Sequence, residues 1–125
     1  MNEEIKWGYY MSESMLESNK PKDCQNLCND FHSTIEFLGK RWMGIIIYSL
    51  FKGPKRYHEI MENIPGISDR LLTERLRDLE KEGLIVKRIL PTPKRKVEYE
   101  LTQSGKKLED VFLTIVAWTQ AKNES

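Results

Sequence analysis

The sequence turns sharply at Pro65-Gly66, between two segments whose apolar residues recur at helical spacing. Proline fixes φ and glycine tolerates a left-handed backbone, so this dipeptide ends one helix and redirects the chain. Ile60 and Ile64, just before the turn, predict a short helix over about 57–63 that faces inward. Ser68, just after it, is a good N-cap because its hydroxyl can accept a backbone N–H of the first helical turn. The chain is thereby constrained to a helix, a tight turn and a second helix.

The second helix is predicted over about 68–82. Leu72, Leu76 and Leu79 form one apolar stripe along it, and Gly83 ends it. The opposite face carries polar and charged side chains at helical spacing. These are Asp69, Arg70, Thr73, Glu74 and Arg77.

The residues on either side complete a small domain. Apolar residues at spacings of three and four predict one core helix over 31–51, apolar nearly all round in its second half and ended by Gly53-Pro54. Strands are predicted at Ile85–Leu90 and Lys96–Leu101, with a hairpin tip at 91–95. A last helix over about 103–121 begins with Thr102 or Ser104 as its cap. We therefore predict a mainly α fold with a small β-hairpin, a winged helix-turn-helix in the order α-α-α-β-β-α.

The charge of the chain is unevenly distributed. The net charge of all 125 residues is only +1, and 39% of residues are hydrophobic, as in a globular domain. Residues 84–107 carry seven lysines and arginines against two glutamates, whereas residues 1–30 carry three lysines against six acidic residues. A local basic segment next to a helix-turn-helix favours contact with a polyanion, although such a run taken alone is more often solvated surface.

The predicted DNA contacts lie on the second helix of the motif and on the hairpin. Arginine can reach guanine edges with two hydrogen bonds, and threonine can contact a thymine methyl group or a phosphate. Basic residues at the hairpin tip would add affinity through phosphates or the minor groove. The residues predicted to contact DNA are Arg56, Ser68, Arg70, Thr73, Arg77, Lys94, Arg95 and Lys96.

Cys24, Cys28 and His32 stand four residues apart, a spacing that suggests a metal site. On a continuous helix the outer two would be about 12 Å apart along the axis, so one tetrahedral zinc could not bind all three. We therefore predict no metal and no cofactor. One thiol, with Cys28 favoured over Cys24, is a candidate redox switch, because a helix N-terminus favours the thiolate. The alternative is two unreactive thiols.

Other functions fit the sequence less well. The sequence contains no glycine loop for phosphates, and neither histidine forms a suggestive catalytic motif with a neighbouring nucleophile, which argues against an enzyme. The sequence contains neither a span of about 20 apolar residues nor a secretory leader, so we expect no membrane contact and a cytoplasmic location. The alternative function is a winged-helix protein–protein interaction module, which would need neither a basic wing nor exposed arginines.

Several motifs in order resemble the HxlR family of winged-helix regulators, over about Cys28 to Lys122. They comprise Leu38–Trp42, Gly53–Tyr57, Ile64–Ser68, Leu72-Thr73, Leu76–Glu80, Gly83–Ile85, Val97–Thr102 and Gly105. Many family members have a cysteine followed by proline before the first helix. Here Cys28 is followed by Asn29, which weakens the transfer of a redox role.

The resemblance implies a homodimeric, MarR-like transcription factor that binds palindromic double-stranded DNA, with a small-molecule or electrophile effector in some members. The implied dimer interface includes Leu108, Val111, Phe112, Ile115 and Trp118 on the last helix. We accordingly predict an N-terminal arm at 1–22, which could add to the dimer, a winged-helix domain at 23–102 and a dimerisation helix at 103–125. Aromatic residues of the arm and the last helix could also enclose an apolar ligand, or simply pack the dimer.

Overall fold

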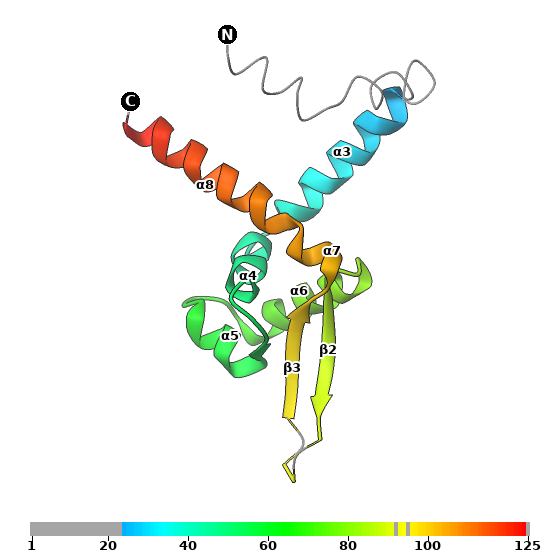
Figure 1. Ribbon diagram of the computed structural model, residues 1–125, viewed down its shortest axis with the longest axis vertical. Coiled ribbons are helices and arrows are strands. Elements are labelled where there is room, and N and C mark those ends of the chain that lie inside the picture. Colours follow the sequence, from blue (N-terminus) through cyan, green and yellow to red (C-terminus); the bar gives the residue numbers. More distant parts are fainter. Residues whose placement is uncertain (1–23, 92, 95, 125) are drawn as a thin grey trace. The chain divides into compact units, whose positions relative to one another are not determined.

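The computed structural model describes residues 24–91, 93–94 and 96–124, with the backbone alone at positions 24 and 25, so the predicted arm at 1–22 lies outside it (Figure 1). The elements are α3 (Cys24–Leu38), α4 (Met43–Leu50), β1 (Lys55–Arg56), α5 (Tyr57–Asn63), α6 (Asp69–Lys81), β2 (Ile85–Leu90), β3 (Lys96–Leu101), α7 (Gln103–Lys106) and α8 (Leu108–Glu124). The chain divides into two units between Gly39 and Lys40, and each is described by itself. Among the described residues, no helix is long and apolar enough to cross a membrane.

The predicted helix, turn, helix and hairpin are confirmed. Helices α5 and α6 lie on either side of the Pro65-Gly66 turn, where Gly66 has a φ of 97°. The Ser68 side chain caps α6 by accepting a hydrogen bond of 3.1 Å from the Leu71 backbone N–H. Strands β2 and β3 pair antiparallel from Ile85 opposite Leu101 to Leu90 opposite Lys96. Figure 1 shows this hairpin extending away from α4, α5 and α6.

A third strand was not predicted. The two residues of β1 pair antiparallel with β3, placing Lys55 opposite Tyr99 and Arg56 opposite Glu98. The strand order is therefore β1-β3-β2. Two residues are too few to show a pattern of period two, so the sequence does not predict this strand. It forms because β3 supplies its backbone partners.

The predicted single helix over 31–51 is wrong, because α3 ends at Leu38 and α4 begins at Met43. Between them, Trp42 has a φ of 72°, a left-handed conformation that costs a non-glycine residue on the order of 1–3 kcal/mol. A methyl group placed on Gly66 would lie 3.6 Å from the Trp42 ring, so this ring packs close to the turn before α6. Tertiary packing therefore breaks a helix that the apolar period would have continued.

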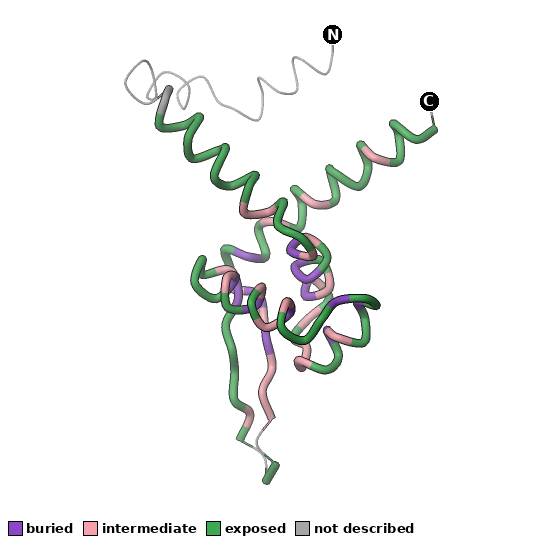
Figure 2. Tube along the Cα trace, turned by 180° about the vertical axis from the view of Figure 1, so that it is seen from behind, coloured by how far each residue is buried: buried purple, intermediate pink, exposed green. Residues whose placement is uncertain are grey.

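The prediction that the helix over 31–51 sits in the core holds only for one side of its second half. In α4, Met43, Ile46, Ile47 and Leu50 are buried, but Ile45 and Tyr48 are each about half exposed. In α3, the apolar residues Leu27, Phe31 and Ile35 are all exposed. Burial is instead concentrated where α4, α5 and α6 meet the base of the hairpin (Figure 2).

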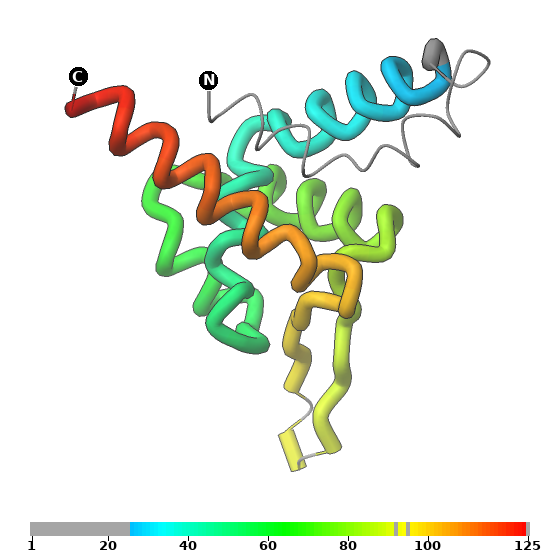
Figure 3. The backbone as a smooth tube through the Cα atoms, turned by 45° about the horizontal axis from the view of Figure 1, so that its top comes forward, coloured from blue at the N-terminus to red at the C-terminus, as the bar shows by residue number. Residues whose placement is uncertain are grey.

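The single helix predicted after the hairpin is two helices. Thr102 caps α7 by accepting a hydrogen bond of 3.1 Å from the Gly105 backbone N–H, and the chain then turns at Lys107 into α8 (Figure 3). A Cβ on residue 105 would lie 2.3 Å from the Leu84 carbonyl oxygen, so only glycine fits here. This close contact holds α7 against the start of β2.

Helix α6 is fixed in place by apolar burial and by two sets of polar contacts. Leu72, Leu76 and Leu79 are buried, as predicted. The Tyr57 hydroxyl, from α5, donates a short hydrogen bond to the Asp69 carboxylate and lies 3.2 Å from the Thr73 hydroxyl.

On the next turns of α6, Arg75 and Asp78 contact the segment between α3 and α4. The Arg75 Nε donates to the Arg41 carbonyl oxygen over 2.9 Å, and its Nη1 lies 3.2 Å from the Asp78 carboxylate. The Lys40 ammonium group lies 3.4 Å from the same carboxylate. These contacts fix both the position and the rotation of α6.

The Tyr57 hydroxyl should make the stability of the fold depend on pH in the alkaline range. Burial, and then the hydrogen bond to the Asp69 carboxylate, raises the pKa of Tyr57 above its ordinary value. The folded chain therefore holds this proton more tightly than the unfolded chain. The resulting stabilisation is fully present below the unfolded pKa of about 10 and is lost as pH rises through the folded pKa.

We expect the free energy of unfolding to fall above about pH 10, and to fall less steeply in Tyr57→Phe, which has no hydroxyl proton. Urea unfolding of both proteins between about pH 8 and pH 11 measures this difference. Tyr48→Phe is the matched control, because Tyr48 is exposed and its hydroxyl has no hydrogen bond among the described residues. Equal alkaline slopes for the wild type and Tyr57→Phe would contradict this prediction.

Candidate nucleic-acid interface

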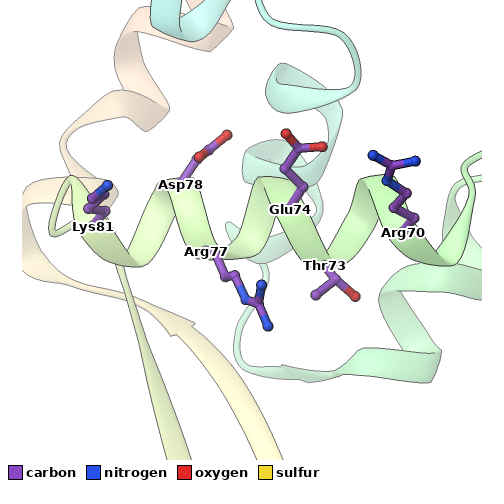
Figure 4. Close-up of a pocket in the computed structure, with 6 residues that line it drawn as sticks. All are labelled: Arg70, Thr73, Glu74, Arg77, Asp78 and Lys81. Carbon is purple, nitrogen blue, oxygen red and sulfur yellow. The ribbon is translucent and has the colours of Figure 1, made fainter.

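The exposed side of α6 forms a shallow polar hollow, drawn in Figure 4. Its lining residues recur at spacings of three and four, so they share one side of the helix. They are Arg70, Thr73, Glu74, Arg77, Asp78 and Lys81. In Figure 4, Thr73 and Arg77 point to one edge of this surface, and Arg70, Glu74 and Asp78 point to the other. The helix therefore presents polar groups along two edges, opposite its buried leucines.

Arg70 and Arg77 are exposed and make no hydrogen bond or ion pair with any residue that the structure describes. Arg77 lies near the base of the hairpin, where its positive charge acts on Tyr99 of β3. Burial, and then the negative charge of Glu80, raises the pKa of Tyr99, and Arg77 opposes that rise. Both guanidinium groups keep all their donors available for an external acceptor.

Two of the acidic groups near these arginines are held by other side chains. Asp69 accepts from Tyr57, and Asp78 pairs with Arg75 and Lys40. Asp69 therefore bonds to a tyrosine of α5 and not to an arginine of its own helix. Lys40 and Arg75 partly compensate the charge of Asp78, so this carboxylate repels an approaching polyanion less than a free one would. The hydrogen bond from the neutral Tyr57 hydroxyl leaves the charge of Asp69 in place.

The other predicted contacts of the helix-turn-helix are distributed around α6. The Ser68 hydroxyl is used as the N-cap, and the Thr73 hydroxyl lies against Tyr57, so neither is a free polar group. Arg56 is half-buried in β1, and its backbone N–H donates 2.8 Å to a Glu59 carboxylate oxygen. This hydrogen bond is the main reason that the pKa of Glu59 is lowered.

The hairpin carries more basic side chains than were predicted as contacts. Lys94 is exposed near the tip and Lys96 is half-buried, while Arg95 lies outside the described residues. Lys87 and Arg88 on β2 are also exposed, and Arg88 is 2.8 Å from the Glu100 carboxylate on β3. Their charges were visible in the sequence, but exposure on β2 follows only from the pairing of the two strands.

Tyr57, Arg75 and Asp78 were missed as functional residues. Each acts through a partner far away in sequence, such as the Arg41 carbonyl oxygen for Arg75, 34 residues earlier. No local pattern announces such a pairing. The only signal in the sequence is that these three residues are polar and lie within the predicted helix-turn-helix.

Helix α3 carries the candidate thiol. Cys28 is exposed and free, and the Cys24 side chain lies outside the described residues. The backbone is helical from Cys24 through His32, which keeps these two residues about 12 Å apart along the axis, too far to bind one zinc ion together. The His32 Nε2 lies 2.8 Å from the Glu36 carboxylate, one turn further on.

Helix α8 exposes much of its apolar surface. Val111, Ile115 and Trp118 are 45%, 53% and 62% exposed, at a spacing that places them on one side of the helix. Leu108 and Phe112, predicted with them, are half-buried. Phe112 packs edge-to-face on Phe51, with ring centroids 5.5 Å apart.

Comparison with known proteins assigns the fold to a family. The HxlR-like helix-turn-helix family profile matches residues 37–125. The HTH-type transcriptional regulator YodB of Bacillus subtilis is 45% identical over 92 residues, covering 74% of this chain and 82% of YodB.

Solved structures agree with this assignment. The reduced form of Bacillus subtilis YodB has a TM-score of 0.67 at 43% identity, over 78% of this chain and 88% of that one. The quinone-bound form has a TM-score of 0.67 at 39% identity, over 75% and 99%. The redox regulator HypR in its reduced form has a TM-score of 0.69 at 33% identity, over 75% and 93%. This chain therefore belongs to the HxlR-like helix-turn-helix family of DNA-binding transcriptional regulators, and not to a family of enzymes.

Proposed function

We propose that this protein binds a palindromic DNA operator as a homodimer, with α6 in the major groove and the β2–β3 hairpin on the backbone or minor groove. The observation that carries the proposal is the pair of exposed arginines on α6, Arg70 and Arg77, neither of which has a hydrogen-bond or ion-pair partner among the described residues. They stand seven residues apart, which is about 10.5 Å along the helix axis or about three base-pair steps of B-DNA, so both can face one major groove. The basic hairpin beside them supplies charge for phosphates.

The division of labour between helix and hairpin follows from their chemistry. Arg77 can donate two parallel hydrogen bonds to the O6 and N7 atoms of guanine, which select the base. Lys94 carries a single ammonium group near the hairpin tip, suited to phosphate contacts that are alike for every sequence. Arg56, Ser68, Arg70 and Thr73 belong to the helix-turn-helix surface in this proposal, and Arg95 and Lys96 to the wing.

A homodimer is needed because one chain presents one recognition helix, whereas a palindrome has two half-sites. Support comes from the exposed apolar side of α8, formed by Val111, Ile115 and Trp118, since such a surface is unfavourable in water. Leu108 and Phe112, which are half-buried, would lie at the base of this surface. In this proposal residues 103–125 form the dimerisation segment, 23–102 the winged-helix domain and 1–22 an arm, and the protein acts in the cytoplasm.

We also include a thiol response in the proposal. YodB has been solved in a quinone-bound form and HypR in reduced and oxidised forms, and this chain has an exposed free thiol at Cys28. Oxidation of the Cys28 thiols of two copies would remove two protons and two electrons, which an added oxidant accepts, and join the copies by a disulfide. A quinone would instead add covalently to one thiolate. The alternative is that both cysteines are unreactive.

The competing function, a winged helix that binds another protein, is less favoured. Such a module needs neither the free arginines of α6 nor the basic residues of the hairpin. DNA binding also predicts a steep loss of affinity between about 50 and 200 mM salt, whereas lack of duplex binding at low salt would favour the protein module.

The roles of helix and wing can be tested with two variants on duplexes selected from a random pool by the wild-type protein. We expect Arg77→Ala to relax base preference by about fivefold to a hundredfold at one base pair of each half-site, because it removes a bidentate donor. We expect Lys94→Ala to weaken selected and scrambled duplexes alike and to lower the salt slope by about one. Binding isotherms at several salt concentrations measure both effects.

Lys52→Ala is the control for charge, because Lys52 is exposed and lies outside α6 and the hairpin. The assignment would be wrong if Arg77→Ala affected all duplexes equally and Lys94→Ala changed base preference.

The dimer can be tested through Trp118. We expect Trp118→Glu to shift the protein toward monomers, because a carboxylate would be buried in the proposed interface, and to reduce affinity for the selected duplex at least tenfold. Sedimentation velocity measures the first effect and duplex titration the second.

Ala117→Glu is the matched control, since residue 117 is exposed and lies about 100° or more around α8 from Val111, Ile115 and Trp118. If Trp118→Glu remained dimeric, α8 would not be part of the dimer interface.

The thiol response can be tested with Cys28→Ser. We expect diamide to lower the duplex affinity of the wild type by about tenfold, within the usual range of allosteric coupling, and to leave Cys28→Ser unchanged. Cys24→Ser, which retains Cys28, is the control and should respond like the wild type. An equal response in Cys28→Ser would exclude Cys28 as the switch.

A further inference from the structure

Tyr57 forms a three-member hydrogen-bond network with the first two turns of α6. Its hydroxyl contacts the Asp69 carboxylate, lies 2.9 Å from the Asp69 carbonyl oxygen and lies 3.2 Å from the Thr73 Oγ1. Asp69 begins α6, and Thr73 stands one turn further on. The network therefore ends on a side chain that lines the exposed surface of α6.

The direction of each hydrogen bond in this network follows from the groups involved. An ionised carboxylate and a carbonyl oxygen can only accept, so Tyr57 must donate its one proton to Asp69. Having no second proton, the Tyr57 oxygen can only accept from Thr73. Thr73 must therefore donate its own hydroxyl proton to Tyr57.

This polarity decides what Thr73 can offer to DNA. Its hydroxyl proton is committed inside the protein, so only oxygen lone pairs and the methyl group remain for an external partner. Figure 4 shows Thr73 on the same edge of α6 as Arg77. In the major groove, cytosine and adenine present amino donors, whereas guanine presents only acceptors. A threonine in this state accepts from the first two bases and has no proton for guanine.

We propose that Tyr57 is a specificity-determining positioning residue, which holds Thr73 as a hydrogen-bond acceptor so that α6 disfavours guanine at the base that Thr73 faces. The inference rests on the proposed placement of α6 in the major groove. Tyr57 itself acts from α5 and through Thr73, and does not contact the base. When the Tyr57 hydroxyl is removed, the Thr73 hydroxyl is free to rotate its proton outward, and α6 then tolerates guanine.

The test is a double-mutant cycle on base preference. The wild type, Tyr57→Phe, Thr73→Val and the double variant each select duplexes from the same random pool at about 50 mM salt. Affinities are then measured for the wild-type consensus duplex and for its single-base changes to guanine. Thr73→Val keeps a branched side chain of similar size but lacks the hydroxyl, and Tyr57→Phe keeps the ring. Thermal unfolding of each variant confirms that it is folded.

We expect Tyr57→Phe to lower discrimination against guanine by about threefold to tenfold at one base pair of each half-site, the usual contribution of one hydrogen bond. Other base pairs should keep their preferences, which a general loosening of α5 against α6 would not allow. In the Thr73→Val background, Tyr57→Phe should change nothing further at that base pair. Tyr48→Phe removes an exposed tyrosine hydroxyl from α4 and should select the wild-type consensus.

Two outcomes would overturn the inference. One is that Tyr57→Phe discriminates against guanine as strongly as the wild type. The other is that Tyr57→Phe lowers this discrimination equally in the wild-type and Thr73→Val backgrounds. Failure of the wild type to select any duplex at low salt would instead contradict the proposed function itself. The two failures are thus distinguished by the wild-type control.

Discussion

Burial of the leucine stripe of α6 is the interaction on which the rest of this structure depends. Leu72, Leu76 and Leu79 are each 2% exposed or less, and burying a leucine contributes about 2 kcal/mol. Because a helix cannot expose the side that it buries, this stripe determines which side chains face outward. The orientation of Arg70 and Arg77 toward solvent is thus a consequence of core packing.

The polar contacts around α6 modify what its outer surface presents. The helix sequence contains four acidic and four basic residues, so its formal charge is zero. Two of the acids, Asp69 and Asp78, are engaged by Tyr57, Arg75 and Lys40, whereas Arg70 and Arg77 keep their donors available. A helix of neutral composition can in this way offer cationic donors to a polyanion.

The segment between α3 and α4 has an unusual role for a short connection. It contains Trp42, the one non-glycine residue with positive φ among those described, and its ring lies near Gly66 at the turn before α6. The neighbouring Arg41 carbonyl oxygen accepts from Arg75 in the middle of α6. The contacts of Trp42 with Gly66 and of Arg41 with Arg75 hold the strained backbone in place, since such a conformation persists only where its surroundings fix it.

Local sequence chemistry was sufficient to predict the helices and strands that are set by turns, caps and periodicity. The Pro65-Gly66 turn, the Ser68 cap and the leucine stripe predicted α6, and alternation predicted β3, because turns, caps and periodicity act within a few residues. The free arginines followed, since they stand opposite the stripe. By itself the sequence therefore determined the helix-turn-helix, the hairpin and the outward face of α6.

Tertiary structure decided the features that depend on distant partners. Trp42 in its left-handed conformation lies against Gly66, β1 pairs with β3, and Gly105 of α7 lies against Leu84, and no local pattern contains these contacts. The same holds for Tyr57, whose hydroxyl meets Asp69 twelve residues later. Hydrogen-bond geometry across elements arises only when packing has brought them together, and for that reason the state of Thr73 could be read only from the folded chain.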